Sequence, residues 1–242
     1  NAEGFLKRSI FLALLACSGL QAATIDLAVN PVDTGSGNTS FNFTYTGGSV
    51  TARAFSVNGT TFATGSIQQF DDGLGLGACN GTELTAQVCG FDNWQVSTYN
   101  GTRDYVMFTF DSNVIVTSLT QLQSSTTFYD NDFQWWYSTT AQTTLPSLAA
   151  FTSGGTYNGA GMQDSSFGSP YATNVATLNT PTLRTLLIAA GQSSTDSTDK
   201  FKILAMDVDS RINQSSVPEP GSMALLGSGL LGLGLVARRR RK

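Results

Sequence analysis

Short runs in which apolar and polar residues alternate restrict most strongly how this chain can fold. Large apolar residues recur at every second position in residues 41–45, 106–110 and 133–137. A period of two is typical of half-buried β-strands. The leucine spacing of residues 183–190 also fits a helix, but we favour a strand, because a polar loop leads from it into residues 201–208, the expected last strand. Seven to ten short strands predict an all-β fold, an antiparallel β-sandwich or jelly roll.

Four Asn-Gly dipeptides punctuate these runs, at residues 58–59, 80–81, 100–101 and 158–159. Both residue types accept a positive φ at low cost, so the dipeptide favours tight hairpin turns. Residues 100–101 separate two of the runs. We therefore expect residues 94–99 and 103–110 to pair as one hairpin.

The last 26 residues differ sharply from the interior in composition. Val217, Pro218, Glu219 and Pro220 precede an uncharged apolar run at residues 221–237, and the chain then ends in Arg238, Arg239, Arg240, Arg241 and Lys242. As a helix the apolar run would be about 25 Å long, slightly shorter than a bilayer core of about 30 Å. The basic cluster predicts a cytoplasmic end, and the prolines predict an extended segment that is open to a protease.

This order of proline pair, short apolar span and basic terminus resembles the PEP-CTERM sorting tail of exported bacterial proteins. The resemblance implies that an exosortase, a membrane cysteine protease, processes the chain. It implies a transient anchor in the inner membrane, with residues 221–237 as a single transmembrane helix, and then release to the cell surface or the extracellular space. A permanent single-pass anchor is the alternative.

The N-terminal region agrees with export. Lys7 and Arg8 precede an apolar stretch and a small-residue region that reaches Ala22 and Ala23, the pattern of a secretory signal peptide with a signal helix, which makes the secretion machinery a partner. A lipoprotein signal ending at Cys17 is the alternative. We therefore expect a signal peptide at residues 1–22, an ectodomain at 23–211, a linker at 212–216 and the sorting tail at 217–242.

Cleavage of the signal peptide would leave two cysteines, Cys79 and Cys89. An even pair in an oxidising compartment predicts a disulfide bond.

The ectodomain is strongly acidic. The segment from Ala23 to Pro220 contains sixteen acidic and six basic residues, which gives a net charge of −10. Such a surface repels the phosphates of nucleic acids, which excludes them as partners. It suits a solvated extracellular protein or one that binds Ca²⁺ through carboxylates. The candidate Ca²⁺ ligands lie in acidic loop sequences: Asp71, Asp72, Asp92, Asn93, Asp130 and Asp132.

A second pattern lies within the ectodomain. Gly73-Leu-Gly75-Leu-Gly77, then Asp92-Asn93, then the run from Arg103 to Val116, then Asp130-Asn-Asp132 are similar to the core of exosortase-dependent surface proteins. This resemblance covers about a quarter of the chain. It supports location and fold and carries no particular chemistry.

Catalysis has little support in the sequence. The chain contains no histidine, which excludes Ser-His-Asp and Cys-His sites and the common zinc sites. Paired aspartates leave glycoside hydrolysis as an alternative. Trp135 is expected in the core with Phe133 and Tyr137, so Trp136 faces the other way, either exposed and able to stack on a sugar or buried under a loop or a second sheet.

Together these features predict a non-catalytic structural or adhesive protein of the bacterial surface, extracellular matrix or biofilm. A carbohydrate-binding module that uses Trp136, with an extracellular polysaccharide as partner, is the second hypothesis. An Asp-based glycoside hydrolase is the third.

Overall fold

The computed structural model describes most of the region between the two predicted signals. The described residues are 22–28, 38–70, 74–79, 95–99, 102–122, 132–144, 146–151, 155–163, 172–191, 199–210 and 228–229. The chain divides into two compact units, of which Ala22–Asn213 forms one. This unit is described here by itself.

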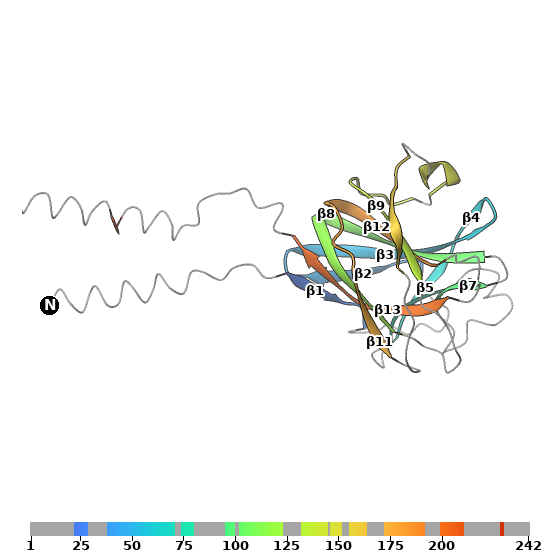
Figure 1. The fold of residues 1–242 in the computed structure, drawn as a ribbon, viewed down its shortest axis with the longest axis horizontal. Helices are drawn as coiled ribbons and strands as arrows, with labels where there is room; N and C mark the ends of the chain where they lie inside the picture. Colours follow the sequence, from blue (N-terminus) through green and yellow to red (C-terminus); the bar gives the residue numbers. More distant parts are fainter. Residues whose placement is uncertain are drawn as a thin grey trace, which may run out of the picture. The chain divides into compact units, whose positions relative to one another are not determined.

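The described residues of this unit form thirteen strands and one 3-10 helix (Figure 1). The strands are β1 (Ala23–Asp26), β2 (Phe41–Tyr45), β3 (Gly48–Asn58), β4 (Thr61–Thr64), β5 (Ser66–Phe70), β6 (Gly75–Cys79), β7 (Val96–Tyr99), β8 (Thr102–Leu122), β9 (Phe133–Ser138), β10 (Asn158–Gln163), β11 (Thr173–Thr177), β12 (Leu183–Ala190) and β13 (Lys200–Asp209), and the helix is η1 (Leu148–Phe151). Every strand pairing in the described residues is antiparallel. The expected all-β, antiparallel class is confirmed.

The long strand β8 connects two groups of strands. Its first half pairs with β3 on one side and β12 on the other, whereas its second half pairs with β13 and β11. Between the halves the register with β12 slips, from Leu183 opposite Val114 to Thr185 opposite Thr109, and such an irregularity lets a strand bend. The curved course of β8 is visible in Figure 1.

The strand prediction was wrong in one respect. Thirteen strands replace the expected seven to ten, and β8 has 21 residues where only shorter runs were expected. Because β8 belongs to both groups, hydrogen bonds join all thirteen strands into one continuous sheet. A β-sandwich or jelly roll therefore stays an interpretation of this topology.

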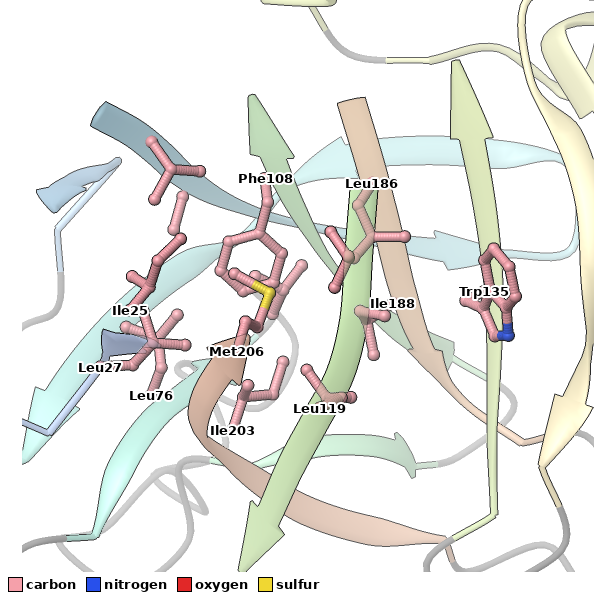
Figure 2. Packing of buried hydrophobic residues seen from close by; sticks show 14 of the residues in the cluster. Ile25, Leu27, Leu76, Phe108, Leu119, Trp135, Leu186, Ile188, Ile203 and Met206 are labelled. Carbon is pink, nitrogen blue, oxygen red and sulfur yellow. The ribbon is translucent and has the colours of Figure 1, made fainter. Parts of the chain in front are cut away.

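The main hydrophobic core draws on both groups of strands. Phe108 and Leu186 come from the β3–β8–β12 group, and Ile25, Met206 and Ile203 come from β1 and β13. Figure 2 shows these side chains in one cluster, with Trp135 of β9 at its side. Phe108, Leu186 and Ile203 are each 0% exposed. Burial of this apolar surface is the main favourable contribution to folding.

Alternation along β3 separates this core from a second cluster. Val50, Ala52 and Ala54 belong to the main core, whereas Phe55 belongs to the second cluster on the opposite face. We call this opposite face of β3, β8, β9 and β12 the outer face. It carries Phe55, Tyr105, Met107, Trp136, Leu187 and Ala189.

Most of the local predictions agree with the structure. Strands β2, β9, β12 and β13 lie where they were expected, and residues 183–190 are a strand rather than a helix. The expected hairpin around residues 100–101 is confirmed, since Tyr99 pairs with Thr102. Asn58 pairs with Thr61, and Gly59 adopts a φ of 59°, as a tight hairpin turn requires.

The turn predicted at residues 158–159 is wrong. Asn158 and Gly159 begin β10 and pair with Tyr137 and Trp136 of β9. A Cβ at Gly159 would lie 3.4 Å from Cδ1 of Trp136, an ordinary van der Waals distance, so the strand does not require a glycine here. Pairing with β9 therefore outweighs the turn preference of the dipeptide.

Candidate functional site

The predicted sorting residues Val217–Pro220 and Arg238–Lys242 lie outside the described residues, as does the N-terminal signal peptide apart from Ala22. The predicted transmembrane span at residues 221–237 is described only at Ser228 and Gly229. No helix among the described residues is long and apolar enough to cross a bilayer.

The predicted Ca²⁺ ligands are only partly described. Asp71, Asp72, Asp92, Asn93 and Asp130 lie outside the described residues. Asp132 is 4% exposed, and its carbonyl oxygen accepts a hydrogen bond of 2.6 Å from the amide of Gly191. No three carboxylate, thiol or imidazole side chains gather into a metal site in the part of the chain that the structure describes. Calcium binding stays a prediction.

A buried acidic residue that the sequence did not single out lies beside Asp132. Asp199 is 0% exposed, and a Cβ at Gly191 would lie 2.8 Å from its Oδ2 and 2.6 Å from Cβ of Asp132. Both aspartates thus pack against Gly191. Only a glycine leaves room for this approach.

Of the two cysteines predicted to form a disulfide bond, only Cys79 lies among the described residues. Cys79 ends β6, is buried, and takes part in a disulfide bond. Its expected partner, Cys89, lies outside the described residues. The pairing of these two cysteines therefore stays a prediction.

Strand β6 gives a structural reason for one glycine of the second sequence pattern, Gly75. Gly75 has a φ of 74°, and a Cβ there would clash with the carbonyl group of Ile203 in β13. Between the glycines, Leu76 is 0% exposed and belongs to the main core. Gly75 thus allows the backbones of β6 and β13 to approach closely, next to the buried side chain of Leu76.

Arg103 is a buried cation on the outer face with several partners. Its Nε donates to the carbonyl oxygen of Ala190 over 2.5 Å, and its Nη2 donates to Oε1 of Gln134 over 3.0 Å. The Cζ atom lies 5.4 Å from the ring centroid of Tyr105 and 5.3 Å from that of Trp136, within the range of cation–π attraction. Burial lowers the pKa of the Arg103 guanidinium, opposed by favourable interactions with Tyr105 and Asp199.

Trp136 is not an exposed platform for sugar stacking. It is 9% exposed, and its ring meets Phe151 edge-on at 5.5 Å and Tyr105 at 5.7 Å. Phe151 ends η1, which belongs to the segment of residues 139–144 and 146–151 that follows β9; we call this the cover segment. The alternative of burial under a loop is therefore the one that the structure bears out.

The rings of Phe151, Trp136 and Tyr105 form an aromatic cluster on the outer face, and Tyr157 packs against Phe151 with ring centroids 5.2 Å apart. Its hydroxyl donates to the Sδ of Met107 over 3.5 Å, a weak acceptor. Burial raises the pKa of Tyr157 to about 12, whereas an unfolded tyrosine ionises near pH 10. The folded state therefore favours the neutral phenol.

This shift predicts a loss of stability at alkaline pH. The contribution of the neutral phenol is complete below pH 10 and disappears as the pH rises through about 12. We expect the free energy of unfolding of the wild type to fall by about 2 kcal/mol more between these values than that of Tyr157→Phe. Urea unfolding at several pH values measures the difference. Parallel pH profiles for the two proteins would contradict it.

A pocket lies at the edge of the outer face, beside the aromatic cluster. Its volume is about 240 Å³. Arg53 and Phe55 of β3 and Met107 of β8 contribute to its lining, and four threonines supply much of the rest: Thr39, Thr64, Thr143 and Thr144. The pocket thus combines one cation, apolar surface and several hydroxyl groups.

The comparison with known families concerns the tail. Residues 216–241 match the PEP-CTERM protein-sorting motif. The chain carries a PEP-CTERM sorting domain. No curated protein matches its sequence. The PEP-CTERM motif implies processing by an exosortase and sorting to the cell surface, which agrees with the prediction from residues 217–242.

The match leaves the β-structured unit of this PEP-CTERM protein outside its bounds. The sequence missed the main features of that unit, namely the Arg103 cluster, Asp199 beside Asp132, and the Arg53 pocket. One signal was available for the pocket. Arg53 is one of only six basic residues between the two signals and lies in a run of small and apolar residues, where a charge is unusual.

Proposed function

We propose that this chain is a non-catalytic surface or matrix protein whose β-structured ectodomain has a structural or adhesive role. The observation that carries the proposal is the sorting motif at residues 216–241, which follows the β-structured unit in the sequence. The proposed route begins with a signal peptide and the secretion machinery. It continues through a transient inner-membrane anchor at residues 221–237 and ends with removal of the tail by an exosortase.

Two properties of the ectodomain support an adhesive rather than a catalytic role. The net charge of −10 between Ala23 and Pro220 keeps it solvated outside the cell. Several of its buried polar side chains form hydrogen bonds within the protein. Arg103 donates to Ala190 and Gln134, and Ser97 donates to Asp104 over 3.1 Å. Such internal hydrogen bonds are typical of a rigid scaffold. The exposed surface of this scaffold would bind other molecules at the cell surface. An extracellular polysaccharide is the proposed partner.

Replacing Pro218, Glu219 and Pro220 together with alanine tests this route. In a host with the matching exosortase, we expect the mature wild-type protein to end near Pro220 and to lack Arg238–Lys242, because the extended segment is accessible to the protease. The triple variant should keep the tail and remain in the membrane fraction. Intact mass of protein from the surface and membrane fractions measures both outcomes.

The same cells test the adhesive role. Washed cells with the triple variant should retain less extracellular polysaccharide than wild-type cells, and a control with Asn213→Ala, outside the matched motif, should behave as the wild type. If wild-type surface protein retains Arg238–Lys242, the chain is instead permanently anchored. Equal polysaccharide retention in all three strains would contradict the adhesive role.

A further inference from the structure

Arg53 carries a buried donor that the described residues leave unsatisfied. Its Nη1 atom is buried and makes no hydrogen bond within the described part of the chain. A buried guanidinium N–H without an acceptor costs free energy, because its hydration is lost and not replaced. This side chain also lines the pocket of about 240 Å³. An acid group bound in this pocket would lie beside the guanidinium of Arg53.

Strand pairing determines where Arg53 points. Its neighbours Ala52 and Ala54 belong to the main core, so alternation directs Arg53 to the outer face. On that face it pairs across the sheet with Met107, and Phe55 lies two residues along the same strand. A ligand whose acid group reaches Arg53 would therefore lie with its body against apolar side chains.

The wall of the pocket opposite the strands is held in place by hydrogen bonds. Thr109 of β8 donates through Oγ1 to the carbonyl oxygen of Gln142 over 2.5 Å, and Thr185 of β12 donates to that of Thr140 over 2.9 Å. The amide of Gln142 donates back to Oγ1 of Thr185 over 2.9 Å. These bonds tie the cover segment to the outer face directly before Thr143 and Thr144. A wall held in this way reduces the entropy lost when a ligand binds.

The chemistry of the lining favours one class of ligand. Guanidinium groups bind carboxylates and phosphates through paired N–H donors. Arg53 is the one cation among the pocket's described lining residues, so a singly charged carboxylate matches it better than a phosphate dianion. The threonine hydroxyls match a hydroxylated body, and Phe55 and Met107 match its apolar face. The volume is below the range of about 300–1,000 Å³ that is typical of drug-sized ligands, which indicates a single ring.

We propose that the Arg53 pocket binds the carboxylate of a uronic acid, a sugar acid, within an acidic extracellular polysaccharide. This inference rests on the proposed surface role, and it names the chemical class of the partner. The carboxylate pairs with Arg53, the ring lies against Phe55 and Met107, and threonine side chains bond its hydroxyls.

Calorimetric titration of the purified, processed protein with glucuronate, glucose, propionate and a uronate tetramer tests the proposal. We expect saturable binding of glucuronate, and binding at least about tenfold weaker for glucose, which lacks the acid, and for propionate, which lacks the ring. Arg53→Met should weaken glucuronate binding at least about tenfold, since a bond to a charged group is lost. Arg53→Lys should have an intermediate effect, because lysine keeps the charge without the paired donors.

Arg184→Met is the matched control. It removes the same charge from another half-buried arginine, whose Nε donates to the carbonyl oxygen of Phe110 and which does not line the pocket. Its glucuronate affinity should equal that of the wild type. Circular dichroism melts of Arg53→Met confirm folding, and we expect no loss of stability, because this substitution removes an unsatisfied donor.

Three results would overturn the proposal. The first is equal glucuronate affinity in the wild type and Arg53→Met. The second is equal affinity for propionate and glucuronate. The third is failure of the tetramer to bind, which would show that the ligand is a free small acid rather than a polysaccharide. If glucuronate does not bind a wild-type protein that is processed and reaches the surface, this inference fails and the proposed function stands. If the wild-type protein is neither processed nor found at the surface, the proposed function itself fails.

Discussion

Arg103→Met is expected to lower the free energy of unfolding by about 3–5 kcal/mol, because two hydrogen bonds from a charged group are lost, each worth about 1.5–3 kcal/mol. The substitution leaves the carbonyl oxygen of Ala190 and Oε1 of Gln134 without their charged donor. It also removes the cation that lies 5.3 Å from the ring centroid of Trp136. Chemical denaturation of the purified, processed protein, monitored by tryptophan fluorescence, measures the loss.

Two further variants separate the causes. Arg103→Lys keeps the charge but cannot reach all the acceptors with one ammonium group, so we expect an intermediate loss. Arg184→Met removes an arginine with a single hydrogen bond to Phe110 and should cost about 1 kcal/mol. If Arg103→Met costs no more than Arg184→Met, the Arg103 cluster does not stabilise the fold as inferred.

Phe108→Ala is expected to cost a similar amount, about 3–5 kcal/mol, for a different reason. Phe108 is 0% exposed and lies on the first half of β8, paired with Ala52 on one side and Leu186 on the other. Truncation removes apolar contacts and leaves a cavity at the centre of the main core (Figure 2). With a total stability of about 5–15 kcal/mol for a typical protein, this loss would leave a substantially weakened fold.

Phe62→Ala is the matched control for this prediction. Phe62 lies on β4, is only partly buried, and packs at the margin of the outer-face cluster, 5.8 Å from Phe151 between ring centroids. The same substitution there should cost less than half as much, because less surface leaves water and the site collapses more easily. Urea midpoints at constant slope give both values. Equal losses would show that β8 does not hold the centre of the core.

The local pattern was sufficient to predict the strands whose two faces differ. Along β9, Phe133 and Trp135 face the main core, whereas Trp136 faces the outer cluster, as the alternation indicates. The hairpin between β7 and β8 was also predictable, because both its strands and its turn are coded within a few residues. The strand at residues 158–159 was not, since it depends on pairing with Tyr137 and Trp136 of β9, which a local pattern does not show.

The pocket illustrates what a local pattern does not contain. Arg53, Met107 and Thr143 come from β3, β8 and the cover segment, and their proximity depends on the pairing of β3 with β8 and on the Thr109 and Thr185 hydrogen bonds. None of these long-range pairings is visible as a periodicity. The sequence left the exposure of Trp136 undecided for the same reason, because the side chain that packs over it, Phe151, belongs to another segment.

By itself the sequence determined the antiparallel β class and the sorting motif, because strand alternation and the tail at residues 216–241 can be recognised in the local sequence without knowledge of the fold. The tertiary structure alone decided that β8 joins both groups of strands, that Trp136 is buried, and that Arg53 presents an unsatisfied donor beside a pocket. The physical reason is that burial and hydrogen-bond satisfaction depend on which distant segments meet, and this depends on the energetics of the whole packed chain.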